Sequence, residues 1–121
     1  MMTLENKELL LKDLCARLPY KTKICIIRES GEEIDADLTT SAIIYFIMWT
    51  VKPYLRPMSS MTEEELSKFM TFKSHIRESE CKFHIANYDM IDWLNSHHFD
   101  YRGLIEKGLA LEAPEGMYKE N

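Results

Sequence analysis

The sequence predicts an α+β fold with an N-terminal helix, a small three-stranded antiparallel sheet, and C-terminal helices packed on one face of that sheet. Three patterns support this prediction. Apolar residues recur at helical spacing near the N-terminus, residues 34–38 alternate apolar with acidic side chains, and residues 62–65 have the pattern of a helix start. A length of 121 residues suits one domain, 1–121, with a tail that frays from about residue 114.

The first helix is expected to begin after Thr3, which can accept a hydrogen bond from the first helical turn. Its expected buried stripe consists of Leu11, Leu14, Cys15 and Leu18, with Leu4 and Leu10 flanking the same stripe. Pro19 disfavours a helical conformation for the residue before it, so we expect the helix to end there.

Three strands are expected next. Residues 23–27 form a short β-branched run, Gly31 lies in a turn, and residues 34–38 alternate as in a half-buried strand. Residues 42–49 are apolar, β-branched or aromatic without helical spacing, which favours a third strand covered on both faces. Because Pro53 and Pro57 remove hydrogen-bond donors, residues 52–57 are interpreted as a stiff surface connection.

Helices follow in the second half of the chain. Thr62 and Glu65 have the spacing of a capping box, and the helix after them is expected to bury Leu66, Phe69 and Met70. Residues 82–86 are compatible with an edge strand, and the next helix is expected to begin near residue 87 or 89. Asp100 is expected to cap a further helical turn that Gly108 closes.

Charge and cysteine content limit the classes of function. Residues 1–60 hold eight basic and eight acidic residues, whereas residues 61–121 hold seven and twelve, a balance of −5 that argues against nucleic-acid binding by the second half. Three cysteines without CxxC spacing make a poor disulfide framework and indicate reduced, mostly buried thiols in a cytoplasmic protein. No secretory signal or membrane-spanning stretch is recognisable.

The histidines, cysteines and acidic residues of the second half could bind a metal or act in catalysis, but simpler structural roles are available to them. Cys81 and His84 have half-site spacing, and further ligands would have to come from His75, His97, His98 and Asp100. Adjacent histidines on a helix diverge by roughly 100°, so we predict no metal and no cofactor. His98 with Asp100 can serve as a general base and Cys81 as a nucleophile, but no established catalytic motif accompanies them. We predict a non-enzymatic protein.

Recognition of another macromolecule is the favoured hypothesis. The bend at residues 97–102 is expected to face solvent, with Arg102 either free for binding or paired with Asp100 or Glu106. The candidate contact surface combines residues of this bend with two from the proline-rich connection: His97, His98, Arg102, Tyr54 and Arg56. The alternative is nucleic-acid binding through basic residues of the first half: Lys21, Lys23, Arg28, Lys52 and Arg56.

Two stretches, VKPYLRPMSSMTEEE and WLNSHHFDYRGLIEKGLALEAP, together with the opening LLLKDLCARLPY, resemble an uncharacterised family of small proteins from phages and prophages of gut Bacteroidales. The family carries no assigned activity, so no residue role follows from it. The resemblance implies a small accessory protein of a mobile element that acts in the bacterial cytoplasm. Its expected partner is a host or phage protein, and the sequence also leaves a homo-oligomer open.

Overall fold

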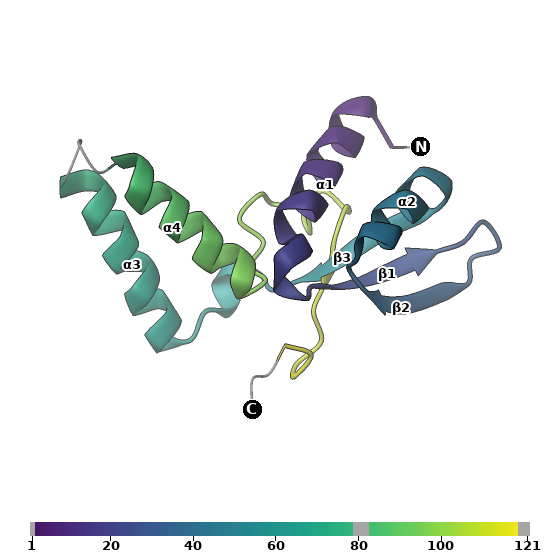
Figure 1. The fold of residues 1–121 in the computed structure, drawn as a ribbon. Helices are drawn as coiled ribbons and strands as arrows, with labels where there is room; N and C mark the ends of the chain where they lie inside the picture. Colours follow the sequence, from purple (N-terminus) through teal and green to yellow (C-terminus); the bar gives the residue numbers. More distant parts are fainter. Residues whose placement is uncertain (1, 79–82, 119–121) are drawn as a thin grey trace.

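The computed structural model describes residues 2–78 and 83–118, without the side chains of residues 75–78 and 83–87. The α+β class is confirmed: helices accompany a mixed four-stranded sheet of order β2-β1-β3-β4 (Figure 1). None of the helices in the described part of the chain is both long and apolar enough to cross a bilayer.

Helix α1 spans Leu4–Arg17 and begins as predicted, because the Thr3 hydroxyl accepts a hydrogen bond from the Asn6 amide. It ends before a short 3₁₀ turn, η1, at Leu18–Tyr20, which contains Pro19. The predicted buried stripe was partly wrong, since Leu11 and Cys15 are exposed. Leu10 and Leu14 are buried as predicted, whereas Leu4 is exposed. Asp13 and Arg17 are buried beside the two leucines, which was not predicted.

Strands β1 (Lys23–Ile27) and β2 (Glu33–Asp37) form the predicted antiparallel hairpin, in which Lys23 lies opposite Asp37 and Ile27 opposite Glu33. The turn between them contains Gly31, whose φ is +90°, a conformation that glycine adopts without steric cost. Alternation along β2 leaves its acidic residues exposed and half-buries Ile34 and Ala36.

A third antiparallel strand is present as predicted, but it is not formed by residues 42–49. Residues Thr40–Met48 form helix α2, whose first turn is capped by the Thr39 hydroxyl accepting from the Ala42 amide. A short apolar run without a clear period fits a strand or a helix equally well. The N-terminal cap at Thr39 and the packing of the run against the core determine that it forms a helix. The helix buries only Ala42, with Ile43 and Phe46 partly buried against the core, so residues 42–49 are not covered on both sides as expected.

Strand β3, Thr50–Leu55, occupies the segment that the prolines had excluded from regular structure, so that expectation was wrong as well. It pairs antiparallel with β1, with Pro53 opposite Ile24, and parallel with β4 (Leu111–Glu112). The Leu55 carbonyl accepts from the Ala113 amide on the β4 side. Backbone groups alternate along a strand, so Pro53 also faces away from β1, and its missing donor costs no bond to that strand.

Helices α1 and α2 cover one face of the sheet, so the prediction that the C-terminal helices cover it was wrong (Figure 1). The core between the layers is aliphatic, with contributions from both helices and from strands β1 and β3: Leu10, Leu14, Ala42, Ile24, Ile26, Val51 and Leu55. On the opposite face, the Tyr54 hydroxyl donates to Asp35 at 2.7 Å beside the buried Cys25. Burial raises the pKa of the Cys25 thiol.

Helices α3 (Glu63–Glu78) and α4 (Phe83–Ser96) form a hairpin that projects from the sheet and its two covering helices (Figure 1). A 3₁₀ turn, η2, at Met58–Ser60 precedes α3. The capping box is confirmed: Glu65 N donates to the Thr62 hydroxyl, and Thr62 N donates to the Glu65 carboxylate. Leu66 and Met70 are half-exposed rather than buried, and helix α4 replaces the edge strand expected from residue 83 onward.

The turn after Asp100 also matches local expectation. The Leu109 amide donates to Leu104 O at 2.9 Å, and the Gly108 amide donates to Ile105 O at 3.0 Å. These two bonds, with Gly108 at φ +75°, make a Schellman motif around a single helical turn. Leu104 and Leu109 are both buried, so the motif carries residues 109–110 into the core.

Candidate functional site

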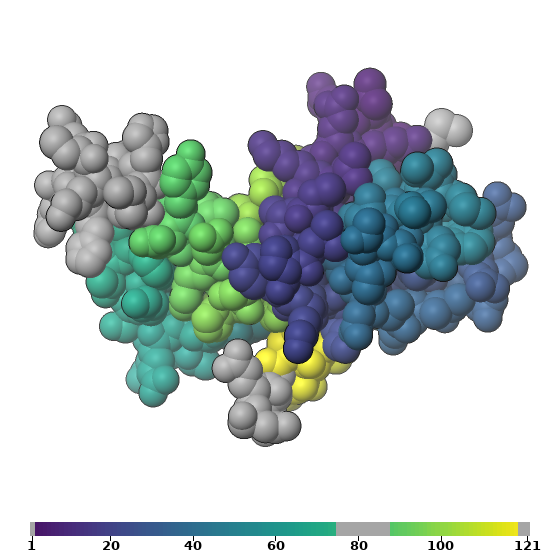
Figure 2. Space-filling model, in the orientation of Figure 1, coloured from purple at the N-terminus to yellow at the C-terminus, as the bar shows by residue number. Residues whose placement is uncertain are grey.

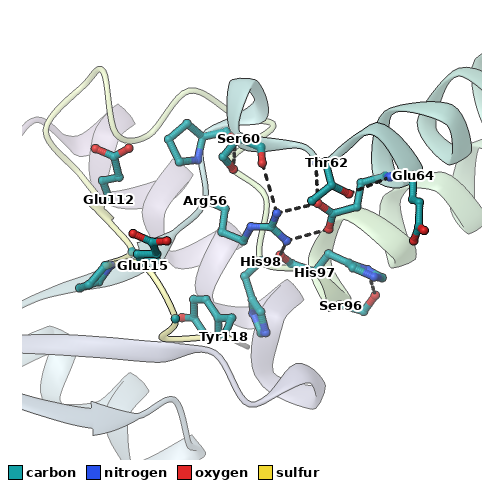
Figure 3. A pocket seen from close by; sticks show the side chains of 15 residues that line it. Arg56, Ser60, Thr62, Glu64, Ser96, His97, His98, Glu112, Glu115 and Tyr118 are labelled. Carbon is teal, nitrogen blue, oxygen red and sulfur yellow. Dashed lines mark hydrogen bonds and ion pairs between the residues drawn. The ribbon is translucent and has the colours of Figure 1, made fainter. Parts of the chain in front are cut away.

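Three of the five predicted contact residues meet at one place. Arg56, His97 and His98 line an open pocket of about 1020 Å³ between the start of α3, the end of α4 and residues 112–118 (Figure 3). Tyr54 lies on the open face of the sheet with its hydroxyl on Asp35. Arg102 contacts Asp13 of α1, so the structure does not gather all five residues.

Arg56 is fixed by a carboxylate from the start of α3. Its Nη1 and Nη2 donate to the two Glu65 carboxylate oxygens at 2.8 and 2.7 Å, and its guanidinium lies 4.2 Å from the centre of the Phe99 ring. These bonds from Arg56 lower the pKa of Glu65 to about 2, with burial opposing and Thr62 assisting. Both side chains are mostly buried, so Arg56 is committed to an internal ion pair.

The backbone of His98 ends helix α4 in an unusual conformation. His98 N donates to Asn95 O and Phe99 N to Leu94 O, both at 3.0 Å, which is a second Schellman motif. His98 occupies the left-handed position, φ +63°, where glycine is the usual residue. A histidine is tolerated there because its side chain and carbonyl find partners, including the Arg56 amide at 2.7 Å from His98 O.

The side chain of His98 is buried, contrary to the expectation that the bend faces solvent. Its Nδ1 lies 3.1 Å from the Thr22 hydroxyl, and its ring stacks on Tyr118 with centroids 3.7 Å apart. Burial, followed by the positive charge of Arg17, lowers the pKa of His98 to about 4. The imidazole is therefore neutral at pH 7.

The Tyr118 hydroxyl fills a gap in the sheet. In the β1–β3 register, the pair after Ile24 and Pro53 would be Lys23 and Tyr54. Instead, the Tyr118 hydroxyl accepts from Lys23 N and donates to Tyr54 O, both at 2.7 Å. Burial raises its pKa to about 12, so it stays a donor at neutral pH. Tyr118 therefore contacts the sheet although it belongs to the tail that is predicted to fray from about residue 114, and the residues beyond it lie outside the described part.

The hypothesis of a His98–Asp100 general base is not supported by the contacts of these residues. The two Asp100 carboxylate oxygens accept from Leu104 N at 2.8 Å and Ile105 N at 3.0 Å, the cap predicted for this turn. His97 lies half-buried with its Nδ1 3.0 Å from Trp93 O. The polar groups of the bend therefore stabilise chain turns.

Arg102 takes part in a buried charge cluster between α1 and the bend. Its Nε donates to Asp13 Oδ1 at 3.1 Å, so neither Asp100 nor Glu106 is its partner as expected. Arg17, with no exposed surface, donates to Asp13 Oδ2 at 2.8 Å and to Phe99 O at 2.7 Å. Its Nη1 is buried without a partner in the described part of the chain. The Asp13 carboxylate thus forms ion pairs with both Arg17 and Arg102.

The metal-binding and nucleic-acid-binding hypotheses can be compared with the structure only where the side chains concerned are described. The side chains of His75, Cys81 and His84 lie outside the described residues, and no metal-binding group of three or more ligands occurs among the side chains that are described. Of the basic residues proposed for nucleic acid, three contact carboxylates: Lys23 with Asp37, Arg28 with Glu32, and Arg56 with Glu65. Those pairings reduce the positive charge available to phosphates.

Comparison of the chain with protein-family models, curated proteins and solved structures gave no match. Function is therefore inferred from this chain's own surface.

The most distinctive surface belongs to α2, which the sequence had suggested was buried. Its exposed large apolar side chains are Ile44 at 58%, Tyr45 at 38%, Ile47 at 84% and Met48 at 59%. Tyr45 stacks on Trp49 at 5.4 Å, and the Arg28 guanidinium lies 5.2 Å from the centre of the Trp49 ring. These six residues are called the α2 face. Helix α2 lies uncovered beside α1 in the space-filling view (Figure 2).

Proposed function

We propose that this chain is a non-enzymatic accessory protein that acts by binding another protein chain, and that the α2 face is its docking surface. The observation that carries this proposal is the composition of α2, TSAIIYFIM, which has no charged residue although its outer side faces solvent. An ordinary surface helix carries charged or polar residues on that side. A contiguous exposed apolar face is typical of an interaction site.

The surroundings of the apolar stripe favour a protein partner. Tyr45, Trp49 and Arg28 adjoin Ile44, Ile47 and Met48, and tyrosine, tryptophan and arginine are the residue types that dominate binding hot spots. A helix that lies in a membrane interface usually carries lysine or arginine along its polar side. Helix α2 has neither, and Arg28 beside it is paired with Glu32, so a protein surface fits it better than a lipid surface.

The pocket residues support a binding role more than a catalytic one. Arg56 is held by Glu65, His98 by Thr22 and Tyr118, and Asp100 by two backbone amides. A general acid or base must reach the substrate proton. Side chains that are already hydrogen-bonded within the chain are poorly placed to exchange a proton with a substrate. Their hydrogen bonds instead stabilise the fold on which α2 is presented.

The resemblance to phage and prophage proteins suggests that the docking partner is a host or phage protein in the bacterial cytoplasm. A second copy of the chain is the other partner to consider. In both cases the partner must bring an apolar surface opposite Ile44, Ile47 and Met48, because these three exposed side chains offer no charge or hydrogen bond.

Site-specific photo-cross-linking in bacterial cells tests this proposal. A photoreactive residue is placed at position 47 on α2, or at position 66 on α3, where Leu66 is 50% exposed. We expect a discrete cross-linked protein at position 47 that disappears with Ile44→Lys, and none at position 66. Equal labelling at both positions, or no product at position 47, would contradict the proposal. Binding of the purified protein to phosphatidylcholine–phosphatidylglycerol vesicles, lost in Ile47→Lys, would show a membrane surface instead.

A further inference from the structure

We propose that the gap between β1 and β3 at Lys23 and Tyr54 is a binding site for the phenol group of a tyrosine side chain. Residues 113–118, called the strap, keep this site occupied by Tyr118, and a tyrosine of another polypeptide binds there when the strap opens. The strap is therefore an autoinhibitory element. None of these residues belongs to the α2 face, so the inference is independent of the proposed docking surface.

The gap offers the groups that a phenol needs. The Tyr118 hydroxyl accepts from the Lys23 amide and donates to the Tyr54 carbonyl, both at 2.7 Å. Its ring stacks on the His98 imidazole with the two centroids 3.7 Å apart (Figure 3). A hydroxyl both donates and accepts, whereas an ammonium group only donates and a phenyl ring does neither. A phenol therefore satisfies both strands and stacks on the imidazole at the same time.

The walls of the site are held in place without the strap. The Thr22 hydroxyl lies 3.1 Å from His98 Nδ1, and the His98 carbonyl accepts from the Arg56 amide at 2.7 Å. The next pair along the strands, Ile24 opposite Pro53, keeps β1 beside β3. None of these contacts includes a residue of the strap, so we expect the site to keep its shape after Tyr118 leaves. Ligand sites are usually preformed in this way.

The strap is attached mainly through its tyrosine. The Ala113 amide donates to a carbonyl of β3 at 2.8 Å, and the Met117 amide donates to Pro114 O inside the strap. Residues 114–116 are exposed. Beyond residue 113, and within the described part of the chain, only Tyr118 makes hydrogen bonds from the strap to the rest of the protein. Opening the strap therefore breaks two short hydrogen bonds and one ring contact, and no helix or strand has to unfold.

The charges around the strap favour its opening. Glu115 of the strap and Glu112 before it line the same pocket as Glu64 of α3. The guanidinium of Arg56, which also lines this pocket, is already paired with Glu65. Like charges repel, so the three other carboxylates destabilise the closed strap, and salt reduces this repulsion. We therefore expect a larger closed fraction as the salt concentration rises.

Because Tyr118 belongs to the same chain, it competes strongly with an outside ligand. A short flexible connection gives an effective concentration in the millimolar range. The apparent affinity of the wild-type chain for an outside tyrosine is reduced by the fraction of molecules in which the strap is open. Removing the ring of Tyr118 should therefore restore the full affinity of the gap.

Titration of the full chain with p-cresol and with the peptide acetyl-APEGMY-amide, which has the sequence of the strap, tests the inference. The amide signal of Lys23 in heteronuclear NMR spectra reports occupancy of the gap. We expect Tyr118→Ala to bind both probes with dissociation constants on the order of millimolar, and the wild type to bind at least about tenfold more weakly. Tyr88→Ala, which removes an exposed tyrosine from α4, should behave as the wild type. Added salt should weaken binding to the wild type more than binding to Tyr118→Ala.

Toluene and the peptide acetyl-APEGMF-amide are matched controls, because they keep the aromatic ring and lack the hydroxyl. Each should bind Tyr118→Ala at least about tenfold more weakly than its hydroxyl-bearing counterpart. Equal binding with and without the hydroxyl, or equal binding by the wild type and Tyr118→Ala, would overturn the inference. A Lys23 amide that responds to neither probe would also overturn it, because the strands would then have closed the gap by a direct bond. Binding of p-cresol without the peptide would overturn the polypeptide ligand and assign the site to small phenols.

The wild-type chain provides the test if Tyr118→Ala fails to fold, as judged by circular dichroism. At high peptide concentration, the amides of residues 115–118 should become mobile as the peptide displaces Tyr118, while the amides of α2 keep their signals. Strap signals that stay unchanged while the peptide binds would place the peptide elsewhere and overturn the inference. The cross-linking from position 47 is read on a different surface, so either result here leaves the test of the α2 face intact.

Discussion

The α2 face and the bend at residues 97–102 use their side chains in opposite ways. The α2 face exposes Ile44, Ile47 and Met48 to solvent, whereas the bend buries His98, Phe99 and Asp100. The buried polar groups of the bend are stabilised by bonds to other parts of the chain, such as Thr22 to His98. The exposed apolar groups of α2 have no comparable partner among the described residues. The comparison shows that burial follows the availability of partners as well as residue type.

The largest expected effect is at the charge cluster beneath the bend. Asp13→Ala should lower the free energy of unfolding by about 3–5 kcal/mol, because it leaves Arg17 buried without a counter-charge. Urea unfolding measures the loss. Glu32→Ala, which removes the exposed ion pair with Arg28, is the control and should cost less than about 1 kcal/mol. A loss of similar size in both variants would mean that the cluster contributes no more than a surface pair.

The second effect is a pH dependence of stability. The pKa of His98 is lowered from 6.5 to about 4 on folding, so the unfolded chain binds a proton more readily between these values. The contribution of neutral His98 to the free energy of unfolding is therefore complete above about pH 6.5 and is lost as the pH falls to 4. The free energy of unfolding should fall by up to about 3 kcal/mol over this range. Below that, Glu65, with its pKa lowered to about 2, continues the loss.

Stability curves for His98→Asn measure this contribution. Asparagine also tolerates the left-handed backbone of residue 98, so the variant removes the titration without forcing the chain out of its turn. The decline between pH 6.5 and 4 should flatten in His98→Asn and persist in His97→Asn. An unchanged decline in the first variant would assign the acid sensitivity to other groups.

A smaller effect is expected at the gap in the sheet. Tyr118→Phe keeps the ring stacked on His98 but leaves Lys23 N and Tyr54 O without the hydroxyl between them. We expect a loss of about 1–2 kcal/mol in the free energy of unfolding, measured by thermal and urea unfolding. Tyr88→Phe on the exposed side of α4 should change stability by less than about 0.5 kcal/mol. Equal effects would show that the hydroxyl is not needed.

The smallest stability effect belongs to the α2 face itself. Ile47→Lys should change the stability of the monomer by less than about 0.5 kcal/mol, because the side chain is 84% exposed. Ile24→Ala, on the face of β1 that packs against the core, should cost about 2–5 kcal/mol. Unfolding at low protein concentration measures both. A large loss in Ile47→Lys would mean that the residue supports the fold of the single chain.

Local signals in the sequence were predictive where neighbouring residues determine the structure. The hydroxyl of Thr3, the reciprocal pair Thr62–Glu65 and the left-handed Gly108 each act within a few residues, and all are present as expected. The hairpin of β1 and β2 follows from alternation in the same way. Helix α2 was missed because an apolar run of nine residues has no period that separates helix from strand.

The burial of the bend and the role of Tyr118 could not be read from the sequence. Thr22 lies 76 residues from His98, and Lys23 lies 95 residues from Tyr118, so their contacts follow from the folded topology. Pro53 was misjudged for a related reason, because its missing donor faces away from β1, and no local rule gives the orientation of a strand. The one usable signal for the candidate site was the absence of charge over residues 40–48.

The position of Tyr118 has a consequence for the order of events during synthesis. Both partners of Tyr118 have been synthesised once the chain reaches Tyr54, which is 64 residues before the tyrosine. At typical elongation rates this is an interval of roughly 3 to 13 s, far longer than a hairpin takes to form. During that interval the Lys23 amide and the Tyr54 carbonyl of the nascent chain lack their bridging hydroxyl. They are then accessible to a chaperone or to another nascent chain.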